Sequence, residues 1–406
     1  MRVALLPDDY LPDSTRVHAK MFHELALELI KRGHEPIVIT PGTPEQRTTL
    51  VIDTIDGVEI WRFRNGVTRG VGKARRAINE SLLPIKAWQA IKHEVKSRPF
   101  DLCINYSPTI FFGPLVRKLK RSGAYVYLIL RDMFPQWIID EGIIKEGTPI
   151  ARYFRFFERL NYRVSDCIGV MSEANLKLFN KLQPGYSNVQ VLMNWADTKP
   201  LSEQMITANW RLDWGLQDKV VFFYGGNIGH AQDMANLMRL AKGMVHKPEA
   251  HFLFVGQGDE VELIHQLKQQ WALDNVTIKP SVSQQVYREL LTQVDVGLFS
   301  LSAKHTAHNF PGKLLGYMVE SLPILGSVNP GNDVIELINT SNSGFVFENG
   351  QDQVLLNAAL ELLDSASRRQ ELGQNARLLL KRYFSVESAL DSILDEAARS
   401  KLQKEA

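Results

Sequence analysis

The sequence predicts an α/β protein built from two consecutive doubly wound domains, and three observations support this. Strand and helix signals alternate along the whole chain, the pattern of a parallel sheet covered by helices. The length of 406 residues exceeds one ordinary core, so two domains are expected. A polar, turn-rich passage over Asn194–Asp218 separates the alternating halves. This architecture predicts a ligand cleft between the domains, at the carboxyl ends of the strands.

The first half begins with a short apolar strand, Val3–Leu6. Over Thr15–Arg32 apolar residues recur at helical spacing, and Gly33 ends the pattern. Further strands are predicted at Pro36–Thr40, Val58–Phe63, Leu102–Ile104, Tyr125–Leu130 and Cys167–Met171, with helices at Ile110–Arg121 and Ala174–Leu182.

The second half repeats this alternation. Its predicted strands are Val220–Tyr224, Phe252–Val255, Val276–Ile278, Val296–Phe299, Ile324–Leu325 and Phe345–Phe347, with helices at Asp233–Val245 and Glu260–Trp271 and two long helices from Gln351 onward. The expected domains are residues 1–195 and 196–385, followed by a C-terminal helix over 386–406 that packs back on the first domain.

The composition restricts the class of protein. Hydrophobic residues make up 45% and charged residues 23%, as in soluble globular proteins, and the net charge of +2 argues against nucleic acid as a partner. The sequence has no export signal and no apolar run of membrane-spanning length. We therefore expect a cytoplasmic protein, with peripheral contact to the inner membrane left open. The two cysteines, Cys103 and Cys167, are expected in the core.

Lys313 is the first candidate for a site. Pro311 and Gly312 open a predicted helix with Lys313 in its first turn, where unpaired backbone N–H groups favour an anion. Glu320 follows two turns later. This arrangement indicates a phosphate site, although an ordinary crossover helix with a surface lysine explains the same residues equally well.

Two glycine-rich turns follow predicted strands in the same half. Gly225-Gly226-Asn227 follows the first strand and Gly256-Gln257-Gly258 follows the second, and glycines allow backbone to approach a ligand closely. The spacing is not that of a dinucleotide fingerprint, and tight turns without a ligand are the alternative. Convergence of both turns with Lys313 would form a nucleotide-diphosphate site.

In the first half, Arg131 and Asp132 follow a buried strand. Burying charge without a partner is costly, so this pair is better placed in a cleft than in a core; a structural bridge between the two is the alternative.

The segments Val71–Arg98 and Tyr153–Tyr162 combine basic and aromatic residues and suit an anionic membrane surface, or packed amphipathic helices. Pro84 is expected to break or kink the first of them.

The order of these motifs resembles that of the GT-B-fold retaining glycosyltransferases of family four, from near the start of the chain to roughly Phe384. The chain is most similar to bacterial surface-polysaccharide transferases, particularly N-acetyl-L-fucosamine transferases of O-antigen assembly. The segments that carry the resemblance are Leu25–Leu29, Arg32–Glu35, Arg131–Pro135, Met193–Asp197, Gly225–Gly229, Val255–Gly258 and Phe310–Met318.

The resemblance implies roles for individual residues. A histidine of the family aligns near Arg131 and Asp132, and two family glutamates align with His308 and Gly316. Arg131, Asp132 and His308 are therefore expected near the reacting centre. The expected donor-binding residues are Gly225, Gly226, Asn227, Gly256, Gly258, Lys304, Lys313 and Glu320. Among them Lys313 replaces the usual phosphate-binding cations, which align with Asn227 and Gln232, and Glu320 reaches the ribose.

The implied function is transfer of a sugar from a UDP-sugar co-substrate to a lipid-diphosphate-linked saccharide on the cytosolic membrane face. No metal or other cofactor is expected, and the sequence contains no Asp-x-Asp triplet. Two alternatives remain open. One is a GT-B-type nucleotide-sugar 2-epimerase, which needs acid–base carboxylates and a soluble substrate. The other is a non-catalytic nucleotide-sugar-binding protein, suggested by the loss of both family glutamates.

Overall fold

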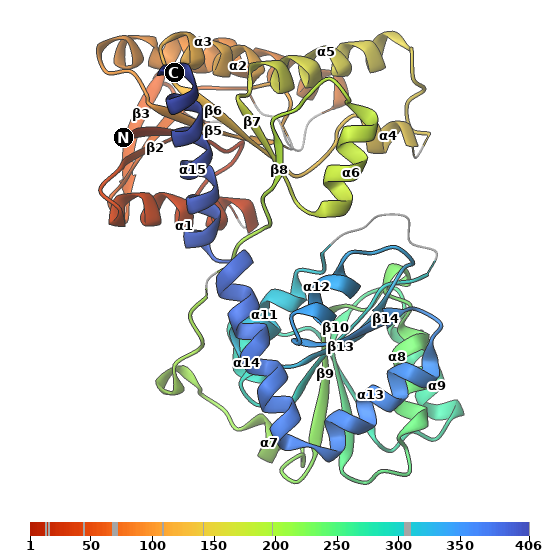
Figure 1. Ribbon diagram of the computed structural model, residues 1–406. Coiled ribbons are helices and arrows are strands. Elements are labelled where there is room, and N and C mark those ends of the chain that lie inside the picture. The colour runs from red at the N-terminus through yellow and green to blue at the C-terminus, as the bar shows by residue number, and fades with distance from the viewer. Residues whose placement is uncertain are drawn as a thin grey trace. The chain divides into compact units, whose positions relative to one another are not determined.

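The computed structural model describes residues 1–12, 14, 17–43, 45–66, 72–107, 109–140, 142–196, 198–303 and 310–405. The chain divides into two compact units, Met1–Trp195 with Val386–Ala406, and Ala196–Ser385 (Figure 1). Each unit has a largely parallel sheet with helices on both faces, as predicted from the alternating sequence signals.

The first unit contains an eight-stranded sheet in the order β3-β4-β2-β1-β5-β6-β7-β8. Its strands are β1 Arg2–Leu6, β2 Glu35–Pro41, β3 Leu50–Ile55, β4 Val58–Phe63, β5 Leu102–Ser107, β6 Tyr125–Leu130, β7 Cys167–Val170 and β8 Val189–Val191. Strands β3 and β8 were not predicted. Strand β3 pairs antiparallel with β4 at the sheet edge, and its side chains are largely exposed although four of its six residues are apolar.

Side chains alternate between the two faces of this sheet. Val3 and Leu5 face one core with α1 and α15, whereas Ala4 and Leu6 face another with α2 and α3. The helices of this unit are α1 Val17–Lys31, α2 Lys73–Ser97, α3 Gly113–Arg121, α4 Gln136–Asp140, α5 Pro149–Val164, α6 Glu173–Leu182 and α15 Val386–Glu405. Cys103 and Cys167 are both buried in the core of this unit.

Pro84 does not break α2, which continues without interruption over Lys73–Ser97. Leu83 and Ile91 of this helix are buried against the sheet together with Pro84. Proline has no backbone N–H, so one helical hydrogen bond is missing at Pro84. Burial of the apolar face stabilises the helix in spite of this loss.

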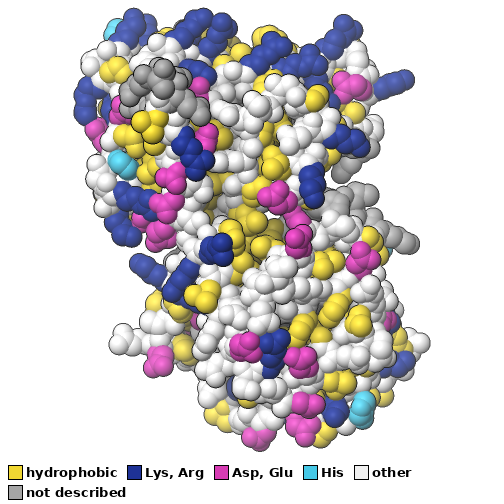
Figure 2. All heavy atoms as spheres, viewed as in Figure 1, with side chains coloured by type: hydrophobic (Ala, Val, Ile, Leu, Met, Phe, Trp, Pro, Cys, Tyr) yellow, Lys and Arg dark blue, Asp and Glu magenta, His cyan; other side chains and the backbone are white. Residues whose placement is uncertain are grey.

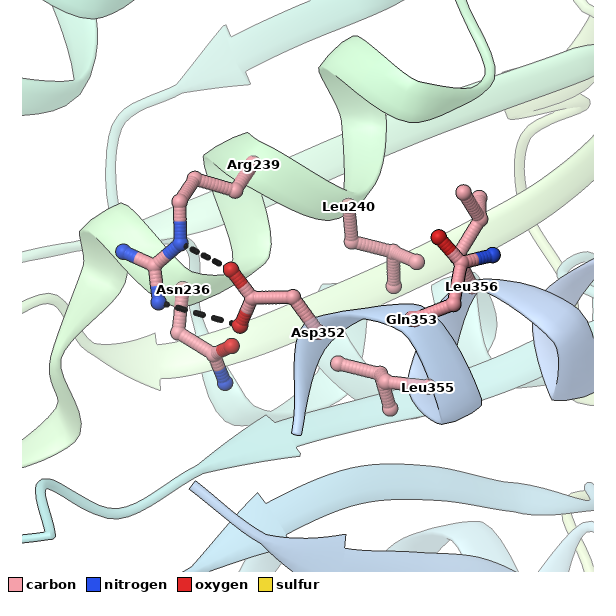
Figure 3. A pocket seen from close by; sticks show the side chains of 7 residues that line it. All are labelled: Asn236, Arg239, Leu240, Asp352, Gln353, Leu355 and Leu356. Carbon is pink, nitrogen blue, oxygen red and sulfur yellow. Dashed lines mark hydrogen bonds and ion pairs between the residues drawn. The ribbon is translucent and has the colours of Figure 1, made fainter. Parts of the chain in front are cut away.

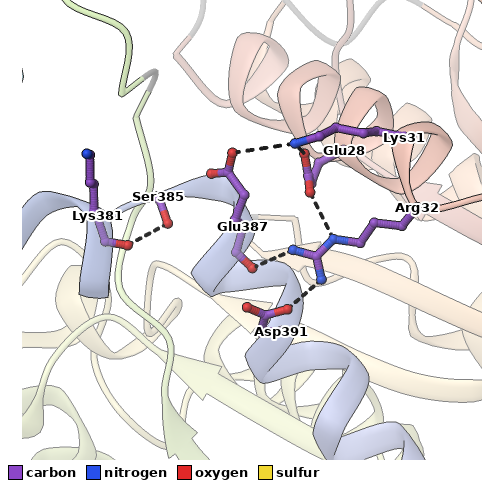
Figure 4. A network of polar contacts seen from close by, with 7 residues as sticks. All are labelled: Glu28, Lys31, Arg32, Lys381, Ser385, Glu387 and Asp391. Atoms are coloured by element: carbon purple, nitrogen blue, oxygen red, sulfur yellow. Dashed lines mark hydrogen bonds and ion pairs between the residues drawn. The ribbon is translucent and has the colours of Figure 1, made fainter.

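Helix α15 is held to α1 by polar contacts at one point (Figure 4). Arg32 Nε donates to Glu28 Oε1 at 2.8 Å, and Arg32 Nη1 donates to Asp391 Oδ1 at 2.5 Å. Arg32 Nη2 also donates to the backbone carbonyl of Glu387 at 3.2 Å. Beside this network, Leu390 and Ile393 of α15 are fully buried in the core of the first unit.

The second unit contains a six-stranded parallel sheet in the order β11-β10-β9-β12-β13-β14. Its strands are β9 Val220–Asn227, β10 Ala250–Gln257, β11 Val276–Lys279, β12 Val296–Ser300, β13 Ile324–Val328 and β14 Gly344–Glu348. Its α-helices are α7 Trp210–Asp213, α8 Met234–Gly243, α9 Val261–Gln270, α10 Gln284–Leu291, α11 Lys313–Val319, α12 Val334–Thr340, α13 Asp352–Asp364 and α14 Ala366–Tyr383; short 3-10 turns cover Glu203–Met205 and His230–Gln232.

Three helices follow Gln351: α13 and α14 in the second unit, and α15 at the place of the expected C-terminal helix. Ser365 separates α13 from α14, and its hydroxyl accepts a hydrogen bond from the N–H of Arg368. A serine at this position caps the second helix, which explains the break within an otherwise helical pattern.

Each sheet has one point where the strand order reverses direction. In the first unit this point lies between β1 and β5, and in the second it lies between β9 and β12. Ligands of open α/β sheets bind beside the carboxyl ends of the strands at such points. The residues that follow β1, β5, β9 and β12 are therefore the first to consider as a site.

Candidate functional site

The amine of Lys313 is the most unusual group at the carboxyl edge of the second sheet. Its Nζ atom is buried, has no hydrogen-bond partner among the described residues, and lies 3.4 Å from the centroid of the Tyr224 ring. Removal from water lowers the pKa of Lys313 to about 7. A buried amine without an anion beside it is costly, and a bound anion would remove that cost.

Gly226, at the end of β9, lies beside this amine. Its backbone has a φ of 122°, a conformation that side chains rarely adopt. A Cβ atom built there would lie 3.8 Å from Lys313 Nζ, with only Lys313 atoms within 4 Å. The structure thus brings together Gly226 and Lys313, two residues that the sequence analysis assigned to one phosphate site.

The other predicted glycines have packing reasons. Strands β9 and β10 stay paired as far as Asn227 with Gln257, so Gly225 and Gly226 lie in a strand and not in a turn. A Cβ on Gly256 would lie 1.9 Å from the carbonyl oxygen of Gly226, and one on Gly258 would lie 2.1 Å from that of Ile228. Close backbone approach therefore explains Gly256 and Gly258 without a ligand.

Asn227 ends β9, and its side-chain amide donates to Gln232 Oε1 at 2.9 Å. The family's phosphate-binding cations align with these two residues, which here bond to each other. Neither of these two aligned positions carries a cation, which adds weight to Lys313 as the phosphate ligand.

The sequence analysis missed Asn236, a buried residue of α8. Its amide donates to Ser300 Oγ at 3.1 Å and to Ser327 Oγ at 2.9 Å, which joins α8 to the carboxyl ends of β12 and β13. This network fixes the strand ends on one side of the Lys313 site. An asparagine inside a helical pattern gives no sequence signal for such a role, because its partners are about 64 and 91 residues away.

Glu320 ends α11, two turns after Lys313. Its Oε1 atom accepts a hydrogen bond from the backbone N–H of Leu201 at 3.0 Å, and desolvation raises the pKa of its carboxyl. One of its oxygens thus has a partner within the unit, and ribose binding remains a prediction.

The predicted residues Lys304 and His308 lie outside the described residues. Helix α11 begins at Lys313, two residues later than the predicted start at Pro311.

In the first unit, Arg131 and Asp132 follow β6. The Arg131 guanidinium is buried and donates to the backbone carbonyls of Leu192 and Met193, at 2.5 and 3.3 Å. Desolvation lowers the pKa of Arg131 to about 10. The side chain of Asp132 is exposed, yet nearby protein atoms raise the pKa of its carboxyl. Arg131 thus supports the 192–193 backbone, while Asp132 is open to a ligand.

A pocket of 110 Å³ lies between α8 and α13 (Figure 3). The ion pair of Arg239 Nε with Asp352 Oδ2, at 2.6 Å, forms part of its lining. Ligand pockets usually have volumes of about 300 Å³ or more, so this one is too small for a nucleotide. It contains none of the predicted donor-binding residues.

Among the described residues, no group of three His, Cys, Asp or Glu side chains could hold a metal ion.

Comparison with known proteins finds similarity to glycosyltransferases. Residues 207–379 match the family model described as "Glycosyl transferases group 1". The putative colanic acid biosynthesis glycosyl transferase WcaI of Escherichia coli (strain K12) is 25% identical over 313 residues, which cover 73% of this chain and 76% of that protein. The matched residues lie within the second unit, Ala196–Ser385.

Two solved structures illustrate the fold. HepE from Anabaena in complex with UDP has a TM-score of 0.63 at 16% identity, covering 98% of this chain and 100% of that one. Sucrose-phosphate synthase from Thermosynechococcus elongatus has a TM-score of 0.61 at 14% identity, covering 100% and 98%. These matches confirm the predicted GT-B fold with two Rossmann-like domains.

Proposed function

We propose that this chain is a glycosyltransferase that moves a sugar from a UDP-sugar to a lipid-diphosphate-linked saccharide in surface-polysaccharide biosynthesis. The observation that carries the proposal is the buried Lys313 amine beside Gly226, at the strand-order reversal of the second sheet. The group 1 domain and the similarity to a colanic acid biosynthesis transferase support it. They favour transfer over an epimerase or a non-catalytic binding protein.

In this proposal the diphosphate of the donor accepts hydrogen bonds from Lys313. The bond between the sugar's anomeric carbon and the diphosphate oxygen breaks, and the acceptor's hydroxyl oxygen bonds to that carbon. The acceptor proton moves to the departing phosphate, and Lys313 stabilises the negative charge that develops on UDP. Retention of anomeric configuration, which the resemblance implies, is part of the proposal. Asp132 and His308 remain the candidates beside the reacting carbon, and Lys304 a second cation.

The membrane side of the proposal concerns the first unit. Helix α3 packs against both α2 and α5, and Figure 2 shows Lys and Arg side chains gathered where these helices lie. Exposed basic residues include Arg76, Lys96, Arg117, Lys118, Arg121, Arg152 and Arg159. Exposed apolar side chains accompany them, notably Ile78 of α2 and Phe156 of α5, at 60% and 61% exposure. This combination suits the surface of an anionic bilayer.

No helix among the described residues is long and apolar enough to cross a membrane.

The experiment that tests the donor is a thermal-shift titration with UDP, GDP and UDP-N-acetyl-L-fucosamine, without added metal. A ligand that binds only the folded state raises the unfolding temperature, and at equal concentration a tighter ligand raises it more. We expect stabilisation by UDP over GDP and the largest shift from the UDP-sugar. No shift with any of the three would contradict the proposal. A shift with GDP alone would change the nucleotide but keep the reaction.

A further inference from the structure

The Lys313 side chain is oriented in the reverse of the usual way for a lysine. Lysines usually bury the hydrocarbon stem and keep the amine in water. Lys313 is partly exposed as a residue, yet its Nζ atom is buried and has no hydrogen-bond partner among the described residues. An atom without exposed surface cannot contact a ligand that arrives from solvent. The amine must therefore change position before the diphosphate of the donor can bind to it.

The ring of Tyr224 provides the place where the amine lies. Tyr224 is a fully buried residue of β9, and Lys313 Nζ lies 3.4 Å from the centroid of its ring. The tyrosine hydroxyl donates to the backbone carbonyl of Asn227, and the ring of Phe254 in β10 lies beside it with the centroids 6.0 Å apart. These contacts fix the ring in place. An aromatic face attracts an amine that has no other partner.

Gly226 leaves open the route by which the amine can move away from the ring. This glycine is exposed at the end of β9, and a Cβ atom built there would have only Lys313 atoms within 4 Å. The space over Gly226 is therefore open apart from the lysine. A short movement across the glycine brings the amine from the ring into contact with solvent. Burial also lowers the pKa of Lys313 to about 7, so negative charge on a ligand at this opening favours the charged, released amine.

We infer that Tyr224 is a positioning residue of the donor site: its ring holds the Lys313 amine out of solvent, and the amine moves off the ring when a diphosphate binds beside Gly226. The inference rests on the proposed function and adds how the same site changes between its free and bound states. Release of the amine costs part of the binding free energy, because only the released state can contact the ligand.

Nuclear magnetic resonance of the full chain, with lysines isotope-labelled at the ε carbon, tests the movement. Protons held over the face of an aromatic ring resonate upfield of their usual position. We expect the ε-methylene of Lys313, identified by its absence in Lys313→Met, to resonate upfield in the free protein. Saturating UDP should return it to the usual position. Uridine, which has no diphosphate, should leave the upfield shift in place.

The matched control is a second lysine that lies over an aromatic ring in the same unit. Lys242 Nζ of α8 lies 4.6 Å from the centroid of the Trp271 ring, which follows α9. Its upfield shift should be the same with and without UDP. A change at Lys242 equal to that at Lys313 would indicate a general effect of UDP on the unit and would overturn the inference.

Two variants of Tyr224 separate the positioning role from a purely structural one. Tyr224→Phe keeps the ring, so it should keep both the upfield shift of Lys313 and the UDP affinity of the wild type. Tyr224→Leu removes the ring, so the amine is no longer held, and UDP should bind about fivefold more tightly in titration calorimetry. A purely structural role predicts weaker binding in Tyr224→Leu. If that variant does not fold, the resonance of Lys313 in the wild type and in Tyr224→Phe decides.

The outcomes separate this inference from the proposed function. If UDP binds while Lys313 keeps its upfield shift, or if the free protein shows no such shift, the inference fails and the proposed function stands. Release of the amine by uridine would also overturn the inference, because no diphosphate is then needed. If UDP itself does not bind, the proposed function fails, and the inference fails with it.

Discussion

The two units carry side chains of opposite charge at the same place in their sheets, the point where the strand order reverses. At the reversal between β9 and β12, the second unit presents Gly226 and the Lys313 amine. At the reversal between β1 and β5, the first unit presents Asp8 with His18 behind it, and Asp132 follows one strand further. The fold places both groups at a reversal of strand order, and the side chains give the two places opposite charge: an amine in one unit and carboxylates in the other.

The two places also differ in how their charges are supported. Lys313 Nζ has an aromatic ring beside it and no hydrogen-bond acceptor among the described residues, whereas the Asp8 carboxylate faces an imidazole at 3.2 Å. A site without its own counterion gains most when the ligand brings one. We therefore expect donor binding to depend steeply on Lys313.

The largest expected effect comes from Lys313→Met, which keeps the length of the side chain and removes its charge. UDP affinity should fall by about 100-fold, or about 3 kcal/mol, as expected for loss of a buried charge-assisted contact. Titration calorimetry measures it. Lys242→Met is the matched control, because Lys242 also lies over an aromatic ring, Trp271, at 4.6 Å but in another part of the unit. Equal affinities for UDP in the Lys313→Met variant and the wild type would contradict the assigned site.

The next effect is a pH dependence of UDP binding. With the pKa of Lys313 at about 7, the free amine loses its proton above neutral pH, whereas the diphosphate binds the charged form. The Kd for UDP should therefore rise by a factor approaching ten per pH unit above about pH 7.5. Lys313→Arg stays charged and should abolish this slope. A wild-type Kd that is constant from pH 7 to 9 would show that the amine does not titrate.

The same pKa has the opposite consequence for stability of the free protein. The unfolded chain keeps this proton up to the ordinary lysine value of 10.5, so between about pH 7 and 10 it binds more protons than the folded chain. The contribution of Lys313 to the free energy of unfolding should therefore increase with pH across this window. Comparison of wild type with Lys313→Met by urea unfolding isolates that contribution.

The smallest expected effect is that of Gly226→Ala. The φ of 122° strains any side chain by about 1–2 kcal/mol, and the new methyl would lie beside the amine. UDP affinity should fall by about fivefold. Gly33→Ala provides the control, because Gly33 also has a positive φ, 76°, with open space around it, and lies after α1. A similar loss of affinity in both variants would indicate a general effect of strain.

Short-range patterns were enough to predict the fold class. Apolar runs such as Tyr125–Leu130 and the helical period over Val17–Lys31 are local properties, and both elements formed as expected. The failures occurred where tertiary packing outweighs local preference. Strand β3 is largely exposed at the sheet edge and is held by pairing with β4, and α2 continues through Pro84 because its apolar face is buried.

The sequence by itself determined the alternating α/β architecture, the GT-B resemblance and the candidacy of Lys313, because each depends on residues close together in the chain. Only the tertiary structure placed Lys313 over Tyr224 and beside Gly226, and only it showed Gly256 and Gly258 to be packing residues. It alone joined Asp8 and His18 to Tyr106, which lies about 90 residues further along the chain, at one reversal of strand order. Strand pairing, which decides such neighbours, depends on contacts over long sequence distances that no local pattern records.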